Sequence, residues 1–438
     1  MTKVITYGTF DLLHQGHINL LKRAKALGDW LIVGVTTDNF DLERGKLNTL
    51  GNVMERIEAV RATGLADQII IEEYRGQKID DIHKYGVDIF AIGSDWEGYF
   101  DYLEEFCKVV YLPRTEGISS TQLRDERPCV KIGIIGTGSI ARRFVDEASY
   151  VASIQICAAY NPDPSQCAAF CSERGIKAAA GMDELLQDCN AVYIASPHDT
   201  HYAYAVQALE AGKHVLCETP FVLKESEAAG LFEIARRKNL VLMMAHKTAY
   251  APAFGHLITL LQSGAIGEIV DIKAAATTLT DNFRSGSMNE NACFPLLPIF
   301  RLLGTDMKDF RFVSKYKDGV DIFTKGILVT DTASASFEVG LGAKTEGSLV
   351  ISGTKGYAYV PAPWWKTSYF ELRYEDQNQN KKYFYPFAGE GLRYEIKEFV
   401  SAILSNGYFY SKLPVKEILA LCKTLEAFNN GKNVTKLR

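Results

Sequence analysis

Two histidines three residues apart, His14 and His17, have the residue type and spacing that most directly indicate chemistry. They lie in the segment GTFDLLHQGH (residues 8–17), where a β-branched run gives way to a helical pattern. This spacing places both imidazoles at one helix N-terminus, where backbone N–H groups and the helix dipole favour phosphate. Paired donors there stabilise the charge that develops on an α-phosphate during nucleotidyl transfer. We therefore predict transfer of a nucleotidyl group to a phosphate monoester, which is already an anion and needs no general base.

A second pattern with chemical meaning is Gly136-x-Gly138-x-x-Ala141, which follows a predicted strand and opens a helix. In that context the glycines permit a tight turn and close approach to a dinucleotide pyrophosphate. Asn161 ends the next strand, where an acidic residue would hold the ribose of NAD. A neutral side chain there removes repulsion against a 2′-phosphate, so we expect NADP at least as readily as NAD, with Asp163 able to reach a ribose. The predicted cofactor contacts of this segment are Gly136, Gly138, Ser139, Ile140 and Asn161.

Both patterns need strands that end at a common sheet edge, and the apolar runs predict such strands. The N-terminal quarter has short runs at residues 4–7, 31–36, 69–71 and 89–92, and the next part has runs at 131–135, 154–159, 191–195 and 214–217. Strands that alternate with helices predict parallel sheets. From about residue 270, alternating runs such as 333–339 and 348–351 predict a mainly antiparallel sheet, followed by helical spacing at the C-terminal end.

The predicted architecture is α/β with three domains, because 438 residues exceed one ordinary core. Residues 1–126 form a Rossmann-like nucleotidyltransferase domain, and residues 130–248 form an NAD(P)-binding Rossmann domain. Residues 249–438 form an α+β domain for substrate binding or oligomerisation. The polar stretch at residues 124–128 is interpreted as a linker.

Composition narrows the class of protein. The 47% apolar and 23% charged residues are typical of a globular protein, and the net charge of −5 argues against nucleic-acid binding. No apolar run is long enough to span a bilayer, and the N-terminus enters a strand without a signal peptide. Nine scattered cysteines without a CxxC pair favour reduced thiols over disulfides or a metal site. We expect a cytoplasmic enzyme with no protein-held metal.

The first 124 residues resemble the glycerol-3-phosphate cytidylyltransferase family nearly end to end. Besides GTFDLLHQGH, the segments DWEG (residues 95–98) and RTEGISST (residues 114–121) are similar to motifs of that family. The resemblance implies CTP as the donor, with Mg²⁺ on its triphosphate. It further implies that His14, His17, Lys46 and Arg114 act in catalysis, and that the nucleotide is bound by Thr9, Phe10, Asp95, Thr115, Ser119 and Ser120.

Two departures from this family affect the acceptor pocket. Ser94 replaces an aspartate before Asp95, and the loop after Lys46 is longer. A family arginine on the following helix has no clean counterpart, because Gly64 stands there with Arg61 nearby. The exact polyol is therefore left open.

Residues 130–438 resemble the Gfo/Idh/MocA oxidoreductase family. The segments that carry this resemblance are ASPHDTH (residues 195–201), AGKHVLCETP (residues 211–220) and GTKG (residues 353–356). The family transfers hydride between nicotinamide and a sugar or polyol carbon, which implies NADP or NAD as the cofactor. By this resemblance, further cofactor contacts are Ser196, Pro197, His201 and Glu218.

Two positions that hold catalytic groups in that family differ here. Thr219 replaces the lysine that binds the reacting oxygen, and Phe294 replaces the histidine or tyrosine that transfers a proton. Lys247, after the strand that follows residues 214–220, is the predicted catalytic replacement. Three further candidates are His246, Glu290 and His198.

These patterns lead to a bifunctional enzyme as the preferred hypothesis. The second half would reduce a keto- or aldo-phosphate to a polyol phosphate. The first would then convert this product with CTP to a CDP-polyol, by default CDP-glycerol, for surface polysaccharide or teichoic acid synthesis. One alternative has the second half act on the CDP-linked product. Another makes it an inactive nucleotide-binding or dimerisation module, and in each case we expect a homo-oligomer, a dimer or higher, with small-molecule substrates.

Overall fold

The computed structural model describes residues 1–43, 49, 53–74, 76–113, 129–280, 285–385, 387–405 and 412–437. The chain divides into two compact units. The first comprises Met1–Cys129 with Tyr150–Ser153, and the second comprises Val130–Ser149 with Ile154–Arg438. The linker predicted at residues 124–128 lies outside the described residues.

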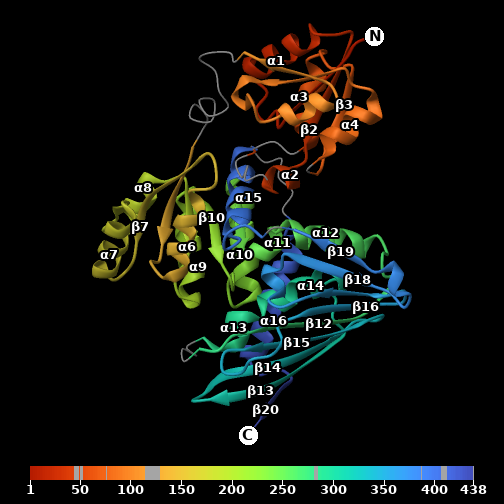
Figure 1. Cartoon of the computed structure of the whole chain (residues 1–438). Helices are drawn as coiled ribbons and strands as arrows, with labels where there is room; N and C mark the ends of the chain where they lie inside the picture. Colours follow the sequence, from red (N-terminus) through yellow and green to blue (C-terminus); the bar gives the residue numbers. More distant parts are fainter. Residues whose placement is uncertain are drawn as a thin grey trace. The chain divides into compact units, whose positions relative to one another are not determined.

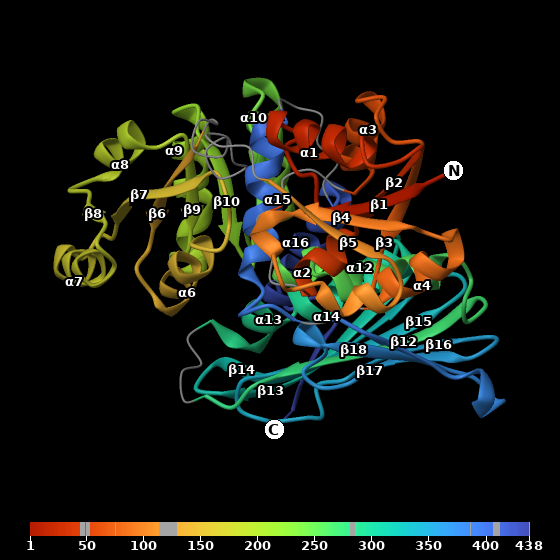
Figure 2. The ribbon, with the colours of Figure 1, turned by 45° about the horizontal axis from the view of Figure 1, so that its top comes forward.

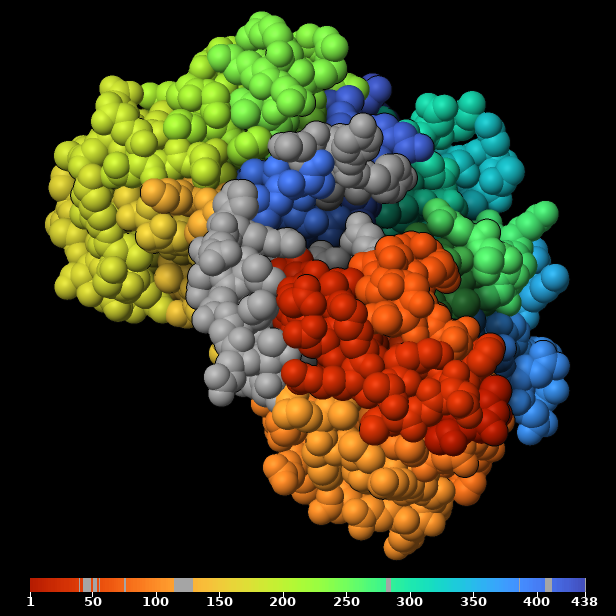
Figure 3. Space-filling view, turned by 90° about the horizontal axis from the view of Figure 1, so that it is seen from above, coloured from red at the N-terminus to blue at the C-terminus, as the bar shows by residue number. Residues whose placement is uncertain are grey.

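The first unit is built on a five-stranded sheet in the order β3-β2-β1-β4-β5, in which all neighbours are parallel. Its strands are β1 (Lys3–Gly8), β2 (Trp30–Thr36), β3 (Gln68–Glu72), β4 (Ile89–Gly93) and β5 (Lys108–Leu112). Its helices are α1 (Gln15–Lys25), α2 (Asp38–Glu43), α3 (Val53–Ala62) and α4 (Gln77–Tyr85), with short 3-10 turns η1 (Ser94–Trp96) and η2 (Asp101–Glu105). In the space-filling view the red and orange parts of this unit form one continuous surface (Figure 3).

The central strands β1 and β2 of the first unit are buried on both faces because helices cover both. Val4 and Ile5 are fully buried but belong to different apolar clusters, since successive side chains of a strand point to opposite faces. This arrangement brings the ends of β1, β2, β3 and β4 to one edge, at which the predicted phosphate site begins.

The second unit begins with a six-stranded parallel sheet in the order β11-β10-β9-β6-β7-β8. Its strands are β6 (Val130–Ile135), β7 (Ile154–Tyr160), β8 (Lys177–Ala178), β9 (Ala191–Ile194), β10 (His214–Glu218) and β11 (Leu242–Ala245). Its helices are α6 (Ser139–Ala148), α7 (Pro164–Arg174), α8 (Met182–Asp188), α9 (His201–Glu210) and α10 (Glu225–Lys238), with η3 (His198–Thr200) before α9.

A nine-stranded sheet completes the second unit, in the order β19-β18-β17-β16-β12-β15-β14-β13-β20. The pairs β12·β15 and β13·β20 are parallel and the other neighbours are antiparallel. The strands are β12 (Ile269–Thr277), β13 (Asp309–Lys317), β14 (Val320–Val329), β15 (Ser334–Gly340), β16 (Leu349–Gly353), β17 (Tyr357–Val360), β18 (Tyr369–Arg373), β19 (Lys381–Phe384) and β20 (Val434–Leu437).

Helices cover one face of this nine-stranded sheet (Figure 1). They are α12 (Pro252–Gln262), α13 (Gly286–Asn291) and α14 (Cys293–Leu303), preceded by the short α11 (Lys247–Tyr250) and followed by α15 (Leu392–Leu404) and α16 (Val415–Asn429). Two 3-10 turns, η4 (Trp364–Lys366) and η5 (Gln377–Gln379), lie in its connections. The predicted fold class, two parallel sheets followed by a mainly antiparallel one, is confirmed. Among the described residues, no helix has the length and apolar character that a bilayer crossing requires.

Candidate active sites

The two predicted catalytic histidines meet at the start of α1. His14 is its N-cap, and His14 Nδ1 accepts a hydrogen bond from the Gly16 amide at 3.0 Å. The His14 and His17 rings stack with centroids 4.0 Å apart. Because Nδ1 accepts, a neutral His14 carries its proton on Nε2, which can donate to a phosphate oxygen. Burial lowers the pKa of His14, which favours this neutral form.

The turn that leads to His14 has an unusual backbone. Phe10 and Leu12 have φ values of 52° and 51°, which non-glycine residues seldom adopt. Phe10 is buried, and its ring meets the His17 ring edge-on at 5.5 Å. Backbone strain of this kind concentrates at functional sites. Phe10, which was predicted to contact the nucleotide, is therefore buried and packs against the His17 ring.

A buried polar network beside this turn includes residues that sequence reasoning missed. Asp41 accepts hydrogen bonds from the Thr9 and Thr36 hydroxyls at 2.9 and 2.7 Å. Arg56 on α3 lies 3.2 Å from Asp41 and donates to the Thr9 carbonyl at 2.7 Å. Arg61, considered from the sequence, is instead exposed and pairs with Glu58. No motif identifies Arg56, whose role follows only from its burial beside the edge of β1.

A second buried cation lies in the first unit at the end of β3. Lys78 on α4 forms an ion pair with Glu72, and its ammonium lies 4.5 Å from the Tyr7 ring centroid. Tyr7 in turn donates to Asp81 at 2.9 Å. Because Glu72 is paired with Thr36 in the sheet register, this pair lies at the strand edge that also carries the histidines.

The remaining predicted residues of the first unit divide into two groups. Asp95 is exposed in η1, directly after β4 and hence beside the end of β1. The others, Lys46, Arg114, Thr115, Ser119 and Ser120, lie outside the described residues. For these residues the sequence prediction stands without a structural test.

In the second unit, the turn after β6 has the shape that close approach to a pyrophosphate requires. Gly136 has a φ of 95°, and a Cβ built there would lie 2.5 Å from the Ala195 carbonyl oxygen. At Gly138, a Cβ would meet nothing within 4 Å, so the turn is open at the N-terminus of α6. Ser139 and Ile140 are the first residues of that helix. Glycine geometry beside an open helix N-terminus fits a dinucleotide.

The end of β7 distinguishes the two predicted ribose contacts. Asn161 donates to the Thr137 hydroxyl at 2.6 Å and thereby contacts the glycine turn. The Asp163 carboxylate instead caps α7 and accepts hydrogen bonds from Ser165 and Gln166. Arg142 donates to the Thr137 carbonyl at 3.2 Å and pairs with Glu173 at 3.2 Å, so Arg142 and Asn161 both contact Thr137. Asp163 has a structural role here, whereas Asn161 and Arg142 lie at the turn itself.

His201 joins two turns at the ends of β9 and β10. Its Nε2 lies 2.9 Å from the Ser196 carbonyl oxygen, and its Nδ1 lies 2.9 Å from the Pro220 carbonyl oxygen. Pro197 directly precedes η3. Burial lowers the pKa of His201. This histidine holds the edge together, while the turns that it joins carry Ser196 and Glu218.

Charged side chains gather at the ends of β10 and β11. Glu218 ends β10 and accepts a hydrogen bond from the Tyr193 hydroxyl. Burial raises the pKa of Glu218, although that hydrogen bond and the charge of Lys247 oppose the rise. Lys247 begins α11, directly after β11, and burial followed by the charge of Lys366 lowers its pKa. Both groups sit at the sheet edge that carries the glycine turn.

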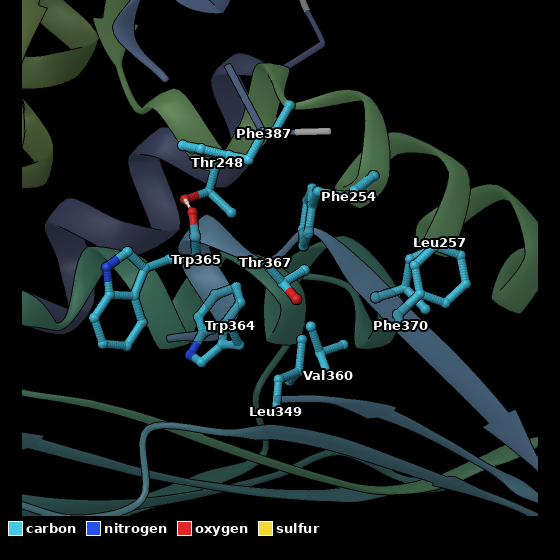
Figure 4. Close-up of a pocket in the computed structure, with 12 residues that line it drawn as sticks. Thr248, Phe254, Leu257, Leu349, Val360, Trp364, Trp365, Thr367, Phe370 and Phe387 are labelled. Atoms are coloured by element: carbon cyan, nitrogen blue, oxygen red, sulfur yellow. Dashed lines mark hydrogen bonds between the residues drawn. The ribbon is translucent and has the colours of Figure 1, made fainter. Parts of the chain in front are cut away.

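Phe294 occupies an aromatic environment. Its ring lies 5.2 Å from His246 and 5.8 Å from Trp365. Trp365 belongs to an apolar cluster between α12 and the nine-stranded sheet, in which the remaining cavity is about 10 Å³ (Figure 4). That space is too small for a substrate. The Thr248 hydroxyl donates to the Trp365 carbonyl at 3.2 Å, which fixes α11 and thus the backbone of Lys247.

Two of the alternative proton donors are poorly suited to the role. His246 Nε2 lies 3.0 Å from the Cys293 carbonyl oxygen, and burial lowers the pKa of His246 to about 4. Burial also lowers the pKa of His198, which meets the His201 ring edge-on. Glu290 on α13 is different, because burial raises its pKa and favours a protonated carboxyl.

Comparison with known proteins connects both sites to families. A family described as cytidylyltransferase-like matches residues 5–126, and an oxidoreductase family with an NAD-binding Rossmann fold, GFO_IDH_MocA, matches residues 130–246. A glycerol-3-phosphate cytidylyltransferase of Bacillus spizizenii is 51% identical over 126 residues, which are 29% of this chain and 97% of that protein. The chain is a cytidylyltransferase fused to a Gfo/Idh/MocA oxidoreductase domain.

The oxidoreductase half has more distant relatives. A dTDP-3,4-didehydro-2,6-dideoxy-α-D-glucose 3-reductase of Saccharopolyspora spinosa is 36% identical over 151 residues. These residues are 34% of this chain and 46% of that protein. The solved structure of KijD10, a 3-ketoreductase from Actinomadura kijaniata in complex with TDP-benzene and NADP, covers 71% of this chain and 100% of its own. Its TM-score is 0.64 at 22% identity, which establishes a shared fold.

Proposed function

We propose that the first unit transfers CMP from CTP to a small polyol phosphate resembling glycerol 3-phosphate, which yields a CDP-polyol and pyrophosphate. The observation that carries this proposal is the stacked His14–His17 pair at the N-terminus of α1. Donors at this position stabilise the added charge on the α-phosphate, as the acceptor phosphate attacks and the bond to the leaving pyrophosphate breaks. The 51% identity over nearly the whole relative supports the same acceptor class.

Magnesium fits this site through the nucleotide. Among the described residues, no group of three or more histidine, cysteine, aspartate or glutamate side chains is arranged to hold a metal ion. Mg²⁺ is commonly held by substrate phosphates with few protein ligands. We infer that it is bound mainly by the CTP phosphates, where it supplies charge neutralisation, while His14 and His17 orient the α-phosphate.

For the second unit we propose an NADP-dependent reductase that converts a keto- or aldo-phosphate to the polyol phosphate used by the first unit. The cofactor supplies hydride when bound. The Gly136 turn would hold its pyrophosphate, and Arg142, which like Asn161 contacts Thr137, would hold its 2′-phosphate, because a guanidinium matches a phosphate.

The two activities in sequence would supply a CDP-polyol for surface polysaccharide or teichoic acid synthesis. A direct experiment incubates the full chain with CTP, NADPH and a ketose phosphate, starting with dihydroxyacetone phosphate, and omits any polyol phosphate. Formation of a CDP-polyol, detected by mass spectrometry, requires both proposed reactions. If a CDP-polyol forms only when polyol phosphate is added, the proposal that the second unit supplies the acceptor is wrong.

One specific observation favours a second candidate, a non-catalytic second unit. The two family catalytic positions are Thr219 and Phe294, and the latter is packed against His246 and Trp365. NADPH oxidation over a panel of ketose and aldose phosphates, with NADH in parallel, separates these possibilities. NADPH binding without turnover on any carbonyl substrate, with CMP transfer intact, would establish that the second unit is non-catalytic.

A further inference from the structure

Glu395, in the first turn of α15, has a buried carboxyl group with no part in the function proposed above. Glu395 is 1% exposed, and its Oε2 has no hydrogen-bond partner among the described residues. A buried polar atom without a partner costs free energy, and such groups call for a specific explanation. Glu395 lies on α15, which packs against the sheet edge that carries Lys247.

The position of α15 follows from its contacts. It packs against α6, α11 and β11, and both ribbon views show it running alongside β10 (Figures 1 and 2). Arg393 forms a double hydrogen bond with Glu147 of α6, at 2.8 and 2.7 Å, which fixes this helix. The adjacent Glu390 is paired with Lys366 and lies 3.7 Å from Arg143. These charges are therefore largely compensated.

Among the described residues, Glu218, Glu395 and Lys247 come together at the buried edge, because Glu218 pairs in register with Ala245 of β11 and α15 packs against α11 and β11. Their charges interact, and burial is the leading cause that raises the pKa of both carboxyls and lowers the pKa of the amine. One ammonium balances one carboxylate, and a second buried carboxylate would be uncompensated. The Tyr193 hydroxyl donates to Glu218 and stabilises its charged form. In the described part of the chain, no donor forms a hydrogen bond with Glu395 Oε2, so Glu395 is the group that retains a proton.

We propose that Glu395 supplies the proton that Lys247 delivers to the carbonyl oxygen of the substrate. The pair would thereby replace the groups lost at Thr219 and Phe294. This inference rests on the proposed reductase function. In the step, the carbonyl carbon gains the hydride that reduced NADP supplies, and the C=O π electrons pass to oxygen. The oxygen takes a proton from the Lys247 ammonium, the amine takes one from the Glu395 carboxyl, and water reprotonates Glu395.

In this scheme Lys247 is the catalytic residue, and Glu395 acts through it. The groups that face Lys247 are Lys366, Glu395, Glu390 and Glu218, and those that face Glu395 are Glu218, Lys247 and Glu147. The pair would titrate in two coupled steps. As pH rises, the charge formed on Glu395 would hold the Lys247 ammonium to a higher pH than burial alone allows.

The first test needs no substrate. The full chain is reductively methylated with ¹³C-formaldehyde, the Lys247 signal is assigned with Lys247→Met, and its pKa is measured by NMR. Glu395→Gln should lower this pKa by about 1–3 units, because glutamine cannot form the carboxylate charge that Glu395 develops as pH rises. Glu398→Gln is the matched control on the same helix, since Glu398 pairs with Lys412. An unchanged Lys247 pKa in Glu395→Gln overturns the proposal.

The second test uses turnover with NADPH. Glu395→Gln should lower kcat by about 10²-fold or more with little change in KM or in NADPH affinity, and Glu395→Asp should restore part of it. The alkaline limb of the kcat profile should move to lower pH in Glu395→Gln. A normal profile in that variant overturns the proposal. If the wild-type chain reduces no carbonyl while the Lys247 pKa still responds to Glu395, the reductase function fails and the charge pair stands.

Discussion

The two candidate active-site edges of this chain organise charge in different ways. In the cytidylyltransferase unit, His14 and His17 come from one short segment at the start of α1, and both are half-buried. In the oxidoreductase unit, Glu218, Lys247 and Glu395 come from elements far apart in sequence and form a largely buried set. In the proposed assignment, the dinucleotide scaffold keeps its glycine turn while its proton chemistry moves to other elements.

The largest effect should separate the two edges completely. Lys247→Met should lower NADPH-dependent reduction by about 10²–10⁴-fold, because it removes general acid assistance. CMP transfer from CTP, measured by pyrophosphate release, should be unaffected. Lys382→Met is a matched control, since Lys382 lies on β19 over the Tyr369 ring. If Lys247→Met still reduced the substrate at the wild-type rate, the proton donor would lie elsewhere, with Glu290 the next candidate.

The reciprocal change should affect only the first edge. His17→Ala should lower kcat for CMP transfer by about 10²–10³-fold, which is the usual cost of one lost donor to a developing oxyanion. NADPH oxidation should stay at the wild-type rate. His83→Ala, an exposed histidine of α4 in the same unit, is the control. Equal losses in both variants would show that the effect comes from folding rather than from the histidine pair.

Cofactor preference should depend on the cation beside the glycine turn. Arg142→Met should raise the Kd for NADPH by about 10- to 100-fold, since a hydrogen bond to a charged group contributes about 1.5–3 kcal/mol. The Kd for NADH should change little, because NADH has no 2′-phosphate. Arg236→Met is the control, as Arg236 pairs with Glu233 on the surface. A parallel loss for both cofactors contradicts the 2′-phosphate role.

The pH dependence of reduction should reflect burial of Lys247. As the proton donor, Lys247 must be in its ammonium form, so kcat should fall as pH rises through its pKa. Burial lowers that pKa, and the decline should therefore begin below the range of an ordinary lysine, about 10.4. Stopped-flow rates of hydride transfer between pH 6 and about 10 measure the profile. A flat profile over this range contradicts the assignment.

The smallest effect should come from Asp163. As the N-cap of α7, it should contribute to stability and not to cofactor affinity. Asp163→Ala should lower the melting temperature of the oxidoreductase unit by about 2–4 °C, in line with loss of a cap. NADPH and NADH affinities should remain unchanged. Weaker NADH binding in this variant would instead return Asp163 to the ribose.

Much of the fold was accessible from sequence because its signals are local. Strands predicted at residues 4–7 and 31–36 correspond to β1 and β2, and the glycine turn follows β6 as expected. The change to a mainly antiparallel sheet was also predicted, although the parallel pair β12·β15 was not. Alternating patterns identify strands but not their partners, since pairing depends on segments distant in the chain.

The candidate site residues divide in the same way. His14 and His17 were predicted from their spacing and from the family resemblance, and the structure brings their ring centroids to 4.0 Å. Arg56 and Glu395 were missed, because nothing near them in sequence indicates a site. Asp163 was considered for a ribose but caps a helix, since its side chain lies two and three residues before free amides.

The sequence by itself determined three features: the two families, the glycine turn, and the helix N-terminus that carries the histidine pair. Each of these rests on residues only a few positions apart. Only the tertiary structure decided which carboxyl groups act on the charge of Lys247. Glu395 is one of them because α15 packs against α6 and α11, with Arg393 held by Glu147. Burial then sets how these groups share protons, and burial is a property of the packed molecule rather than of any segment.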